Sequence, residues 1–159
     1  MGKSYYILIL ENYSMSERRK TNSVVLLILL KENADSKEVL LQLRQNTGYM
    51  DDMWDMAATG HVEANEKIED AALREAREEL DIIIDKKDIK LVSLEHKATE
   101  NYYLFFFLCS KYVGNPKISE PDKCTSLVWF DFDFLPVNII EHNKRAIEKL
   151  KNNIFYEIN

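Results

Sequence analysis

Three glutamates near the middle of the chain, Glu75, Glu78 and Glu79, lie at spacings i, i+3 and i+4. On a helix, these spacings place the three side chains on one side of the surface. Like charges so placed destabilise a helix by roughly 0.2–0.5 kcal/mol per pair, so a helix shaped by stability alone would avoid them. Carboxylate oxygens are hard ligands that suit Mg²⁺ or Mn²⁺. The spacing predicts a site for a divalent cation, against the alternative of a solvated acidic face.

The helix that must position these glutamates has an apolar stripe beside them. Leu73, Ala76 and Leu80 follow one another at i, i+3 and i+7. This stripe predicts that the helix packs on a core and leaves the carboxylates at the rim of a cleft. Asp81 comes directly after the stripe, and aspartate is one of the few residues other than glycine that adopt the left-handed conformation at a helix end. We therefore expect the helix to end there.

The stretch from Gly60 to Ile82 resembles the Nudix box, G-x5-E-x7-R-E-U-x-E-E-x-G-U, in which U is a bulky aliphatic residue. Ala76 departs from the pattern at a U position, and Asp81 replaces the second glycine. The resemblance implies the α/β fold of that family, an αβα sandwich around a mixed β-sheet, as a single domain over residues 1–159. The chain matches the pattern at Gly60, Glu66, Arg74, Glu75, Glu78, Glu79 and Ile82.

The resemblance also implies a chemistry, the Mg²⁺-dependent hydrolysis of a nucleoside diphosphate linked to another moiety, with Mn²⁺ as the alternative ion. The oxygens of a P–O–P linkage repel a nucleophile, and a divalent cation neutralises them and lowers the pKa of a bound water. By this resemblance, Glu75, Glu78 and Glu79 are metal ligands. Gly60 is expected to let the loop backbone approach the metal.

Two further acids and one arginine have expected roles. By the same resemblance, Glu66 and Arg74 form an ion pair that ties the loop before the helix to the helix itself. The general base stays open between Glu75, Glu79 and a downstream carboxylate. Glu120 lies in a loop where some relatives carry such an extra acid, and the alternative for Glu120 is an ordinary exposed loop position.

Candidate substrate-binding residues lie on both sides of the box. Arg44 ends a predicted strand, where a guanidinium suits phosphate oxygens, with a surface ion pair as the alternative, and His61 follows the box glycine. Trp129 and Asp131 resemble residues that stack on and hydrogen-bond a base in relatives that act on nucleoside triphosphates, although such a tryptophan is often simply part of the core. The segment 49–53 is expected to form a loop over the pocket and to discriminate the group attached to the phosphates.

The composition is that of one globular domain, with 159 residues, 46% hydrophobic residues and a net charge of −6. That charge argues against binding to a nucleic acid polymer, while a small nucleotide bound through metal ions fits. Cys109 and Cys124 are the only cysteines, and their spacing indicates buried reduced thiols rather than a zinc or redox site. Many relatives form dimers, so homodimerisation is a hypothesis that the pattern does not decide.

No targeting or membrane segment is predicted. The apolar run Tyr5–Leu10 lacks a basic leader and a cleavage site, and it reads as an additional strand. The run Val24–Leu30 is too short to cross a bilayer and reads as a buried strand. We therefore expect no association with a membrane and a cytoplasmic location.

Hydrophobic patterns predict the remaining elements. A hairpin is expected from the Val24–Leu30 strand into a second strand that ends at Arg44, and a helix is expected over Ile139–Leu150. Tyr102–Ser110 is too apolar to be exposed on either face, which indicates a central strand. The predicted strands from the hairpin onward are Val24–Leu30, Val39–Arg44, Ile89–Lys97, Tyr102–Ser110 and Ser126–Phe132.

The expected reaction is hydrolysis of a nucleoside triphosphate, including oxidised forms, to the monophosphate and pyrophosphate. This expectation follows the resemblance of a short single domain to small mutator-suppressing pyrophosphohydrolases. One alternative is hydrolysis of nucleotide sugars or other X-linked nucleoside diphosphates. A second alternative is a non-catalytic nucleotide-binding regulator on the same fold, although the box carboxylates that such domains usually lose are all present here.

Overall fold

The computed structural model describes residues 20–34 and 36–156, so the strand expected in the first ten residues lies outside the described part. Two helices, one short 3-10 helix and seven strands make up this part. In chain order the elements are β1 (Asn22–Glu32), β2 (Lys37–Arg44), β3 (Trp54–Met56), β4 (Ala58–His61), α2 (Ile68–Leu80), η1 (Lys86–Asp88), β5 (Ile89–Lys97), β6 (Tyr102–Cys109), β7 (Cys124–Asp131) and α3 (Glu141–Lys151).

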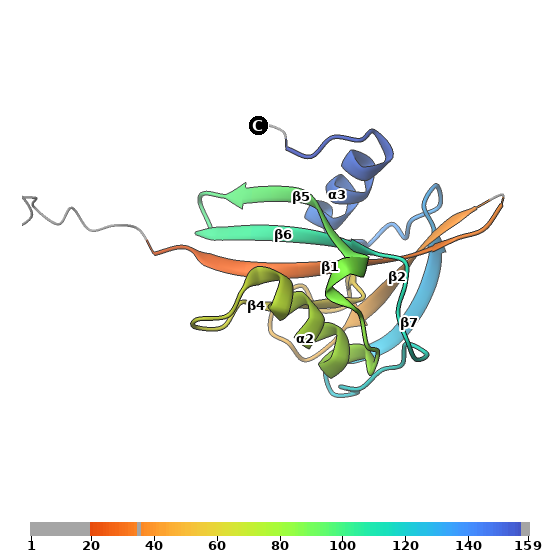
Figure 1. Ribbon diagram of the computed structural model, residues 1–159, viewed down its shortest axis with the longest axis horizontal. Coiled ribbons are helices and arrows are strands. Elements are labelled where there is room, and N and C mark those ends of the chain that lie inside the picture. The colour runs from red at the N-terminus through yellow and green to blue at the C-terminus, as the bar shows by residue number, and fades with distance from the viewer. Residues whose placement is uncertain (1–19, 35, 157–159) are drawn as a thin grey trace, which may run out of the picture.

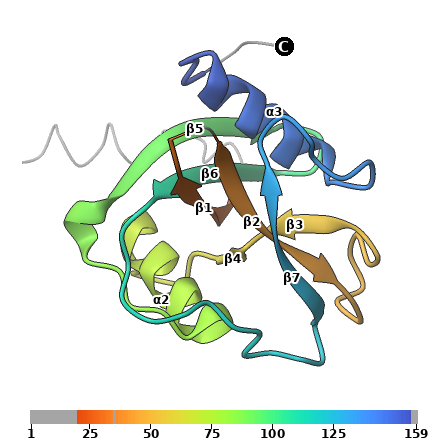
Figure 2. The same ribbon diagram turned by 90° about the vertical axis from the view of Figure 1, so that its right-hand side faces the viewer.

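Strand β1 holds the sheet together because it pairs with three other strands along its length (Figure 1). Its first part pairs with β6 in parallel and with β4 in antiparallel orientation, and its last three residues pair with β2. The main path of the sheet runs β3-β2-β1-β6-β5, with β7 attached to β2. Figure 2 shows β2, β3 and β7 grouped together at the end of the molecule that faces the viewer. The sheet is therefore mixed, as expected.

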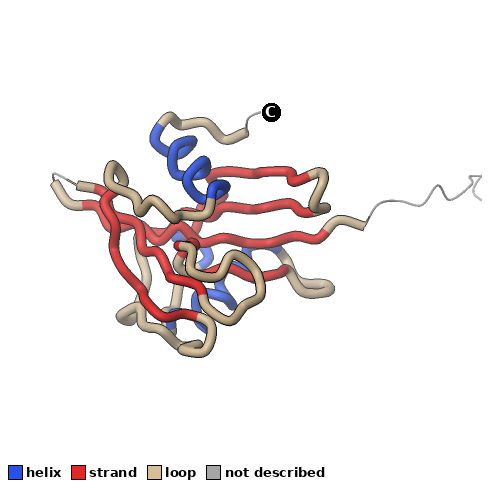
Figure 3. Tube along the Cα trace, turned by 180° about the vertical axis from the view of Figure 1, so that it is seen from behind, coloured by secondary structure: helices blue, strands red, loops and turns tan. Residues whose placement is uncertain are grey.

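The two helices cover opposite faces of this sheet (Figures 1 and 3). Alternate residues of β1 enter two separate cores, because side chains on a strand alternate between its faces. Val25, Leu27 and Leu29 pack with the residues of α2, while Leu26 and Ile28 pack with those of α3. The predicted α/β sandwich, with its mixed sheet between helices, is confirmed.

Most of the predicted elements are confirmed, with ends that differ by a few residues. The hairpin forms between β1 and β2, and β6 is a central strand with Phe106 and Phe107 buried. The short strands β3 and β4 had no clear sequence pattern and were not predicted. Cys109 and Cys124 are free and buried. Within the described residues, no helix is long and apolar enough to cross a membrane, and the cytoplasmic location stays a prediction.

Helix α2 packs closely on the sheet because its buried face is small. Ala71, Ala72 and Ala76 are fully buried together with Leu80, whereas Leu73 is only partly buried. The alanine at position 76, where the Nudix pattern has a larger residue, thus allows a close approach of helix and strand. Asp81 ends the helix in the left-handed conformation, with φ 54° and ψ 39°, as expected from the sequence.

A buried polar network joins β2, β3 and α3. The carboxylate of Asp55, which is 4% exposed, accepts hydrogen bonds from Arg44 Nη1 at 2.6 Å and from Asn143 Nδ2 at 2.7 Å. Asn143 is fully buried, and its Oδ1 has no hydrogen-bond partner among the described residues. The network therefore fixes α3 to strands β2 and β3.

Asp55→Ala is expected to lower the free energy of unfolding by about 3–5 kcal/mol, because it removes the carboxylate partner of the largely enclosed Arg44 guanidinium and the acceptor of the buried Asn143 amide. The matched control is Glu32→Ala, which removes a surface ion pair with Lys37 in which both side chains are 56% exposed. Its cost is expected to stay below about 1 kcal/mol. Urea unfolding of both variants measures the difference, and equal costs would contradict a structural role for the network.

Candidate active site

Arg74 on α2 contacts three of the four box glutamates through one guanidinium. Its Nε and Nη2 donate to the two carboxylate oxygens of Glu66 at 2.9 and 3.0 Å. Its Nη1 donates to Glu75 Oε1 at 2.6 Å and to Glu78 Oε2 at 3.1 Å, and Nη2 also reaches the carbonyl oxygen of His61 at 3.0 Å. The structure thus brings Glu66 and Arg74 together and uses the same arginine to offset the repulsion between Glu75 and Glu78.

Gly60 makes room for the Glu75 carboxylate. A Cβ atom built on Gly60 would lie 1.8 Å from Glu75 Oε1, a distance that no real contact allows. The sequence placed Gly60 in a loop, but it lies in strand β4, paired with Val25 of β1. The glycine is therefore required for space between helix and strand rather than for an unusual backbone conformation.

The side chain of Glu79 extends from α2 to strands β2 and β4. Its Oε2 accepts hydrogen bonds from the backbone N–H of Thr59 at 2.9 Å and from Gln42 Nε2 at 3.3 Å. Burial raises the pKa of Glu79 to about 8, and the negative charges of Glu75, Asp55 and other acids nearby add to that rise. At neutral pH and without a cation, this carboxyl group therefore retains its proton.

Glu75 has the same tendency to a smaller extent. Burial raises its pKa, with a contribution from the neighbouring Glu78 and Glu120 carboxylates, and outweighs the opposite effect of Arg74. Two carboxyl groups, those of Glu75 and Glu79, thus lie in partly desolvated positions where nearby positive charge does not fully offset the cost of ionising them. Such a pair is typical of a functional site.

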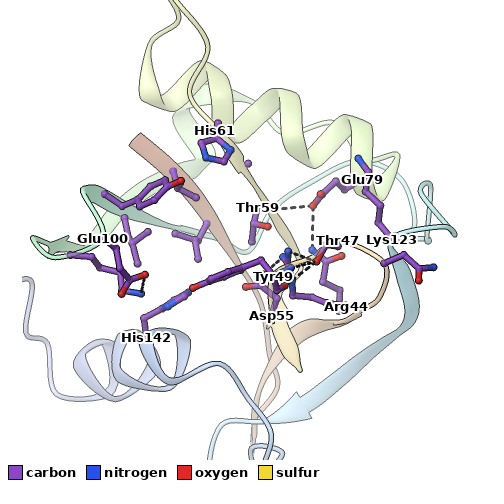
Figure 4. A pocket seen from close by; sticks show the side chains of 18 residues that line it. Arg44, Thr47, Tyr49, Asp55, Thr59, His61, Glu79, Glu100, Lys123 and His142 are labelled. Atoms are coloured by element: carbon purple, nitrogen blue, oxygen red, sulfur yellow. Dashed lines mark hydrogen bonds and ion pairs between the residues drawn. The ribbon is translucent and has the colours of Figure 1, made fainter. Parts of the chain in front are cut away.

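A cavity of about 610 Å³ opens beside these carboxylates (Figure 4). Its wall is apolar along β1 and β6, where Val24, Leu26 and Leu104 line it. Its polar groups come from β2 to β6, from both helices and from the loops beside them. They include the predicted residues Arg44, Gly60, His61 and Glu79, together with Gln42, Thr47, Tyr49, Asp55, Thr59, Lys97, Glu100, Tyr102, Lys123 and His142.

Arg44 faces this cavity, but most of its hydrogen-bonding capacity is used within the protein. Its three nitrogens donate to Asp55 Oδ2 at 2.6 Å, to the Tyr49 carbonyl oxygen at 2.9 Å and to Thr47 Oγ1 at 3.0 Å. A role in substrate binding therefore rests on its remaining N–H groups and on its charge.

Trp129 and Asp131 lie on β7 and do not line the cavity. Trp129 pairs with Leu40 and packs against the core under α2, with Lys31 Nζ 5.7 Å from its ring centroid. Asp131 accepts a hydrogen bond from the backbone of Asp133 in the turn that follows. Trp129 is thus partly buried against the core, and its role as a base-binding residue stays a prediction.

Glu120 lies close to the carboxylates of α2. Its two oxygens accept from Lys123 Nζ at 2.9 and 3.0 Å, and its charge contributes to the raised pKa values of Glu75 and Glu79. Together with Glu79, Glu120 and Lys123 also line a small cleft next to the main cavity. Glu120 is therefore near the site rather than on a distant surface.

Several cavity residues were not singled out as site residues from the sequence. Asp55 and Thr59 belong to the short strands β3 and β4, whose pattern was not recognised. His142 begins α3, and burial lowers its pKa, which favours the neutral imidazole. An apolar neighbourhood and a position at a predicted helix start are the only signals that would have drawn attention to His142.

The donor atoms of this site suit a hard divalent cation. Arg74 Nη1 already lies between oxygens of Glu75 and Glu78, which shows that this position attracts positive charge. In the part of the chain that the structure describes, no three His, Cys, Asp or Glu side chains converge tightly enough to hold an ion as they stand. The residues fit Mg²⁺ or Mn²⁺ by the chemical type of their oxygen donors.

Comparisons with known proteins agree with the box and the fold. The curated protein "Putative nudix hydrolase 1" of Caenorhabditis elegans is 28% identical over 150 residues, which are 94% of this chain. The chain spans only 38% of the length of that relative.

Solved structures show the same fold. A MutT NUDIX hydrolase from Burkholderia pseudomallei has a TM-score of 0.71 and 25% identity, over 81% of this chain and 97% of its own. The NUDIX domain of Shewanella oneidensis NrtR, solved in complex with ADP ribose, has a TM-score of 0.68 and 17% identity, over 96% of this chain and 98% of its own. The family model described as NUDIX domain matches residues 20–150. Since this match includes the box and covers most of the described residues, from β1 to the last turn of α3, the chain belongs to the NUDIX domain family.

Proposed function

We propose that this chain is a hydrolase that cleaves the diphosphate linkage of a nucleoside diphosphate linked to another moiety, with Mg²⁺ as cofactor and Mn²⁺ as a substitute. The observation that carries the proposal is the placement of two box carboxyl groups. Glu79 is partly buried and lines a cavity of about 610 Å³, and Glu75 is buried against Gly60, which lines the same cavity. Membership of the family and the hydrolase relatives support it.

Glu75, Glu78 and Glu79 are the residues that would hold the ion, together with the backbone of Gly60. When bound, the ion neutralises the phosphate oxygens and lowers the pKa of water. With a cation bound, Glu79 would be ionised, and because it is the box glutamate that lines the cavity it is the best placed of the candidate bases to accept a proton from an attacking water. Glu120 is the second candidate, and its pairing with Lys123 would have to open first.

Cationic side chains of the cavity support binding of an anionic substrate. Arg44 and Lys123 line the cavity near Glu79, and Lys97 lines it from β5. Lys97 and Lys123 are each paired with a glutamate at 2.8 and 2.9 Å, respectively, so phosphate groups would compete with these partners. In a protein of net charge −6, such local cations offset the general repulsion of a phosphate chain.

The preferred substrate class is a nucleoside triphosphate, cleaved to the monophosphate and pyrophosphate. The similarity to the MutT hydrolase of B. pseudomallei supports this choice. ADP ribose in the NrtR domain favours the alternative, a nucleotide sugar or another X-linked nucleoside diphosphate. A non-catalytic nucleotide-binding role is less favoured, because Glu75, Glu78 and Glu79 are all present. Four further expectations stay predictions: formation of a homodimer, no binding to a nucleic acid polymer, no association with a membrane, and a single domain over residues 1–159.

A panel of nucleoside triphosphates, nucleotide sugars and ADP-ribose is expected to yield metal-dependent turnover, with the released nucleotide and phosphate species identifying the bond that breaks.

Glu78→Gln is expected to lower kcat by at least about 100-fold without unfolding the protein, since the Glu78 side chain is 55% exposed. Asp70→Asn on the same helix is the matched control and should leave turnover unchanged. Wild-type turnover that persists in EDTA would contradict the metal-dependent mechanism.

The metal-free protein is expected to lose stability as the pH rises from 5 to 8. The pKa of Glu79 is near 4.5 in the unfolded chain and about 8 in the fold, so between these values the folded state binds more protons than the unfolded state. Its free energy of unfolding therefore falls with rising pH and levels off above the folded pKa. Chemical denaturation across this pH range measures the slope.

Glu79→Gln is the matched variant for this experiment. It is expected to reduce the slope and to stabilise the metal-free protein at pH 8 by roughly 2 kcal/mol or more, because it removes a carboxylate that is costly to ionise. The pKa of Glu75 is also raised, so part of the slope should persist. A variant with the wild-type slope would show that Glu79 is not the group that titrates.

Gly60→Ala is expected to abolish metal-dependent turnover while most of the fold is kept. The new methyl group would displace the Glu75 carboxylate from strand β4, since a Cβ there lies 1.8 Å from Glu75 Oε1. Binding of Mn²⁺, followed by electron paramagnetic resonance, should weaken in parallel with activity. Gly48→Ala is the comparison, because Gly48 has no atom within 4 Å of its added Cβ, although its φ of +75° adds backbone strain. Full activity of the Gly60 variant would contradict the proposed position of Glu75.

A further inference from the structure

Tyr49 is an exposed aromatic residue at the cavity that no step of the proposed hydrolysis uses. It lies in the loop between β2 and β3, residues 45–53, and 45% of its surface is exposed. Figure 4 shows Tyr49 among Arg44, Thr47 and Asp55 in the cavity, with Glu79 and Thr59 beyond. An aromatic ring left in water beside an apolar wall is available for contact with a planar ligand.

The loop that presents Tyr49 is firmly held, although it lies at the surface. Asp51 Oδ1 accepts a hydrogen bond from the backbone N–H of Thr47 at 3.0 Å and lies 2.6 Å from Thr47 Oγ1. Asp51 Oδ2 accepts from the backbone N–H of Gly48 at 3.1 Å. These bonds close the turn directly before Tyr49 and lower the pKa of Asp51, so Asp51 stays ionised and keeps its acceptors at neutral pH.

Unusual backbone conformations in the same loop point in the same direction. Met50 has a φ of 51°, in the left-handed region that large side chains avoid, while Asn46 and Asp52, at 52° and 62°, are of residue types that adopt this region more readily. Such conformations persist only where the surrounding contacts hold them, and they gather at sites that bind ligands. The loop is thus held in one conformation before a ligand binds.

Arg44 connects Tyr49 to the phosphate side of the cavity. Arg44 Nε donates to the Tyr49 carbonyl oxygen at 2.9 Å, and its Cζ lies 5.8 Å from the centroid of the Tyr49 ring. His61 and Tyr102, whose ring centroids are 5.9 Å apart, also line the cavity and add aromatic surface to its apolar wall. A ligand with a phosphate chain near Glu79 and a planar group next to Tyr49 would use both kinds of surface.

We propose that Tyr49 stacks on the planar aromatic base of the substrate and that Asp51 is the positioning residue that fixes the ring for this contact. The inference rests on the proposed function in one respect, that the ligand is a nucleotide. It assigns to Tyr49 the stacking role that the sequence had suggested for Trp129, which the structure places outside the cavity. Base recognition would then come from the loop after β2 rather than from β7.

The experiment measures equilibrium binding by isothermal titration calorimetry, with Mg²⁺ present, so that it does not depend on turnover. The ligands are α,β-methylene analogues of a purine and of a pyrimidine nucleoside triphosphate, and inorganic tripolyphosphate, which has the phosphate chain without a base. Tyr49→Ala is expected to raise Kd for the nucleotide analogues about 10-fold, the usual effect of losing one aromatic–base stack, and to leave Kd for tripolyphosphate unchanged. Tyr49→Phe should bind like the wild type, and Tyr49→Leu should resemble Tyr49→Ala.

Tyr156→Ala is the matched control, because Tyr156 is 51% exposed and does not line the cavity. Asp51→Ala is expected to raise KM for a hydrolysed nucleotide more than it lowers kcat, and Asp51→Asn, which keeps a side-chain acceptor, should restore most of the loss. Equal binding by Tyr49→Ala and Tyr156→Ala would overturn the inference. An equal loss for nucleotides and tripolyphosphate would also overturn it, because the effect would then lie in the phosphate site.

The outcomes separate this inference from the proposed function. Nucleotide binding that depends on Tyr49, without any turnover of the wild type, would support the stacking role and contradict the hydrolase. Turnover that is indifferent to Tyr49 would support the hydrolase and contradict the stacking role.

Discussion

The site depends on how one guanidinium holds several carboxylates on the same side of a helix. Arg74 contacts Glu66, Glu75 and Glu78 at once and also bonds to the backbone of β4. Without such a partner, the neighbouring negative charges would repel one another and destabilise the helix. Among the described residues, no hydrogen bond joins Arg74 to Glu79. Burial of the Glu79 carboxyl group is therefore not offset by this arginine, and the pKa of Glu79 rises to about 8. The ion pairs of Arg74 therefore stabilise the acidic helix and at the same time leave the Glu79 carboxyl group available to a cation.

The scaffold makes this arrangement possible by bringing helix and strand close together. The buried alanines of α2 let the helix approach β1 and β4, and Gly60 leaves the space that the Glu75 carboxylate fills. Strand β1 enters two cores, one under each helix, so it fixes the cavity wall and the acidic helix relative to each other. Small side chains at particular places matter here as much as the charged groups, because packing sets the distances between those groups.

Sequence reasoning succeeded where the interactions are local. The left-handed end of α2 at Asp81 and the pairing of Glu66 with Arg74 depend on short spacings and on a recognisable pattern. It was less informative where distant segments meet. Asp55 and Asn143 are 88 residues apart, and no local pattern indicates their contact. For Trp129, the alternation along β7 predicts two faces but not which of them borders a cavity, since that depends on how β7 pairs with β2.

The buried carboxylate of Asp55 has a consequence for how this protein can diversify. Asp55 borders the cavity and at the same time anchors α3 through Asn143 and fixes Arg44. A lineage that acquired a new ligand preference by changing this position would lose heat tolerance in the same step, and a second change elsewhere would have to restore it. The neighbouring loop after β2 is tied to the segment before α3 at Asp52, whose carbonyl oxygen accepts a hydrogen bond from Asn138 Nδ2, and not to the buried Asn143. Substitutions at the exposed positions of this loop therefore leave the anchor of α3 in place.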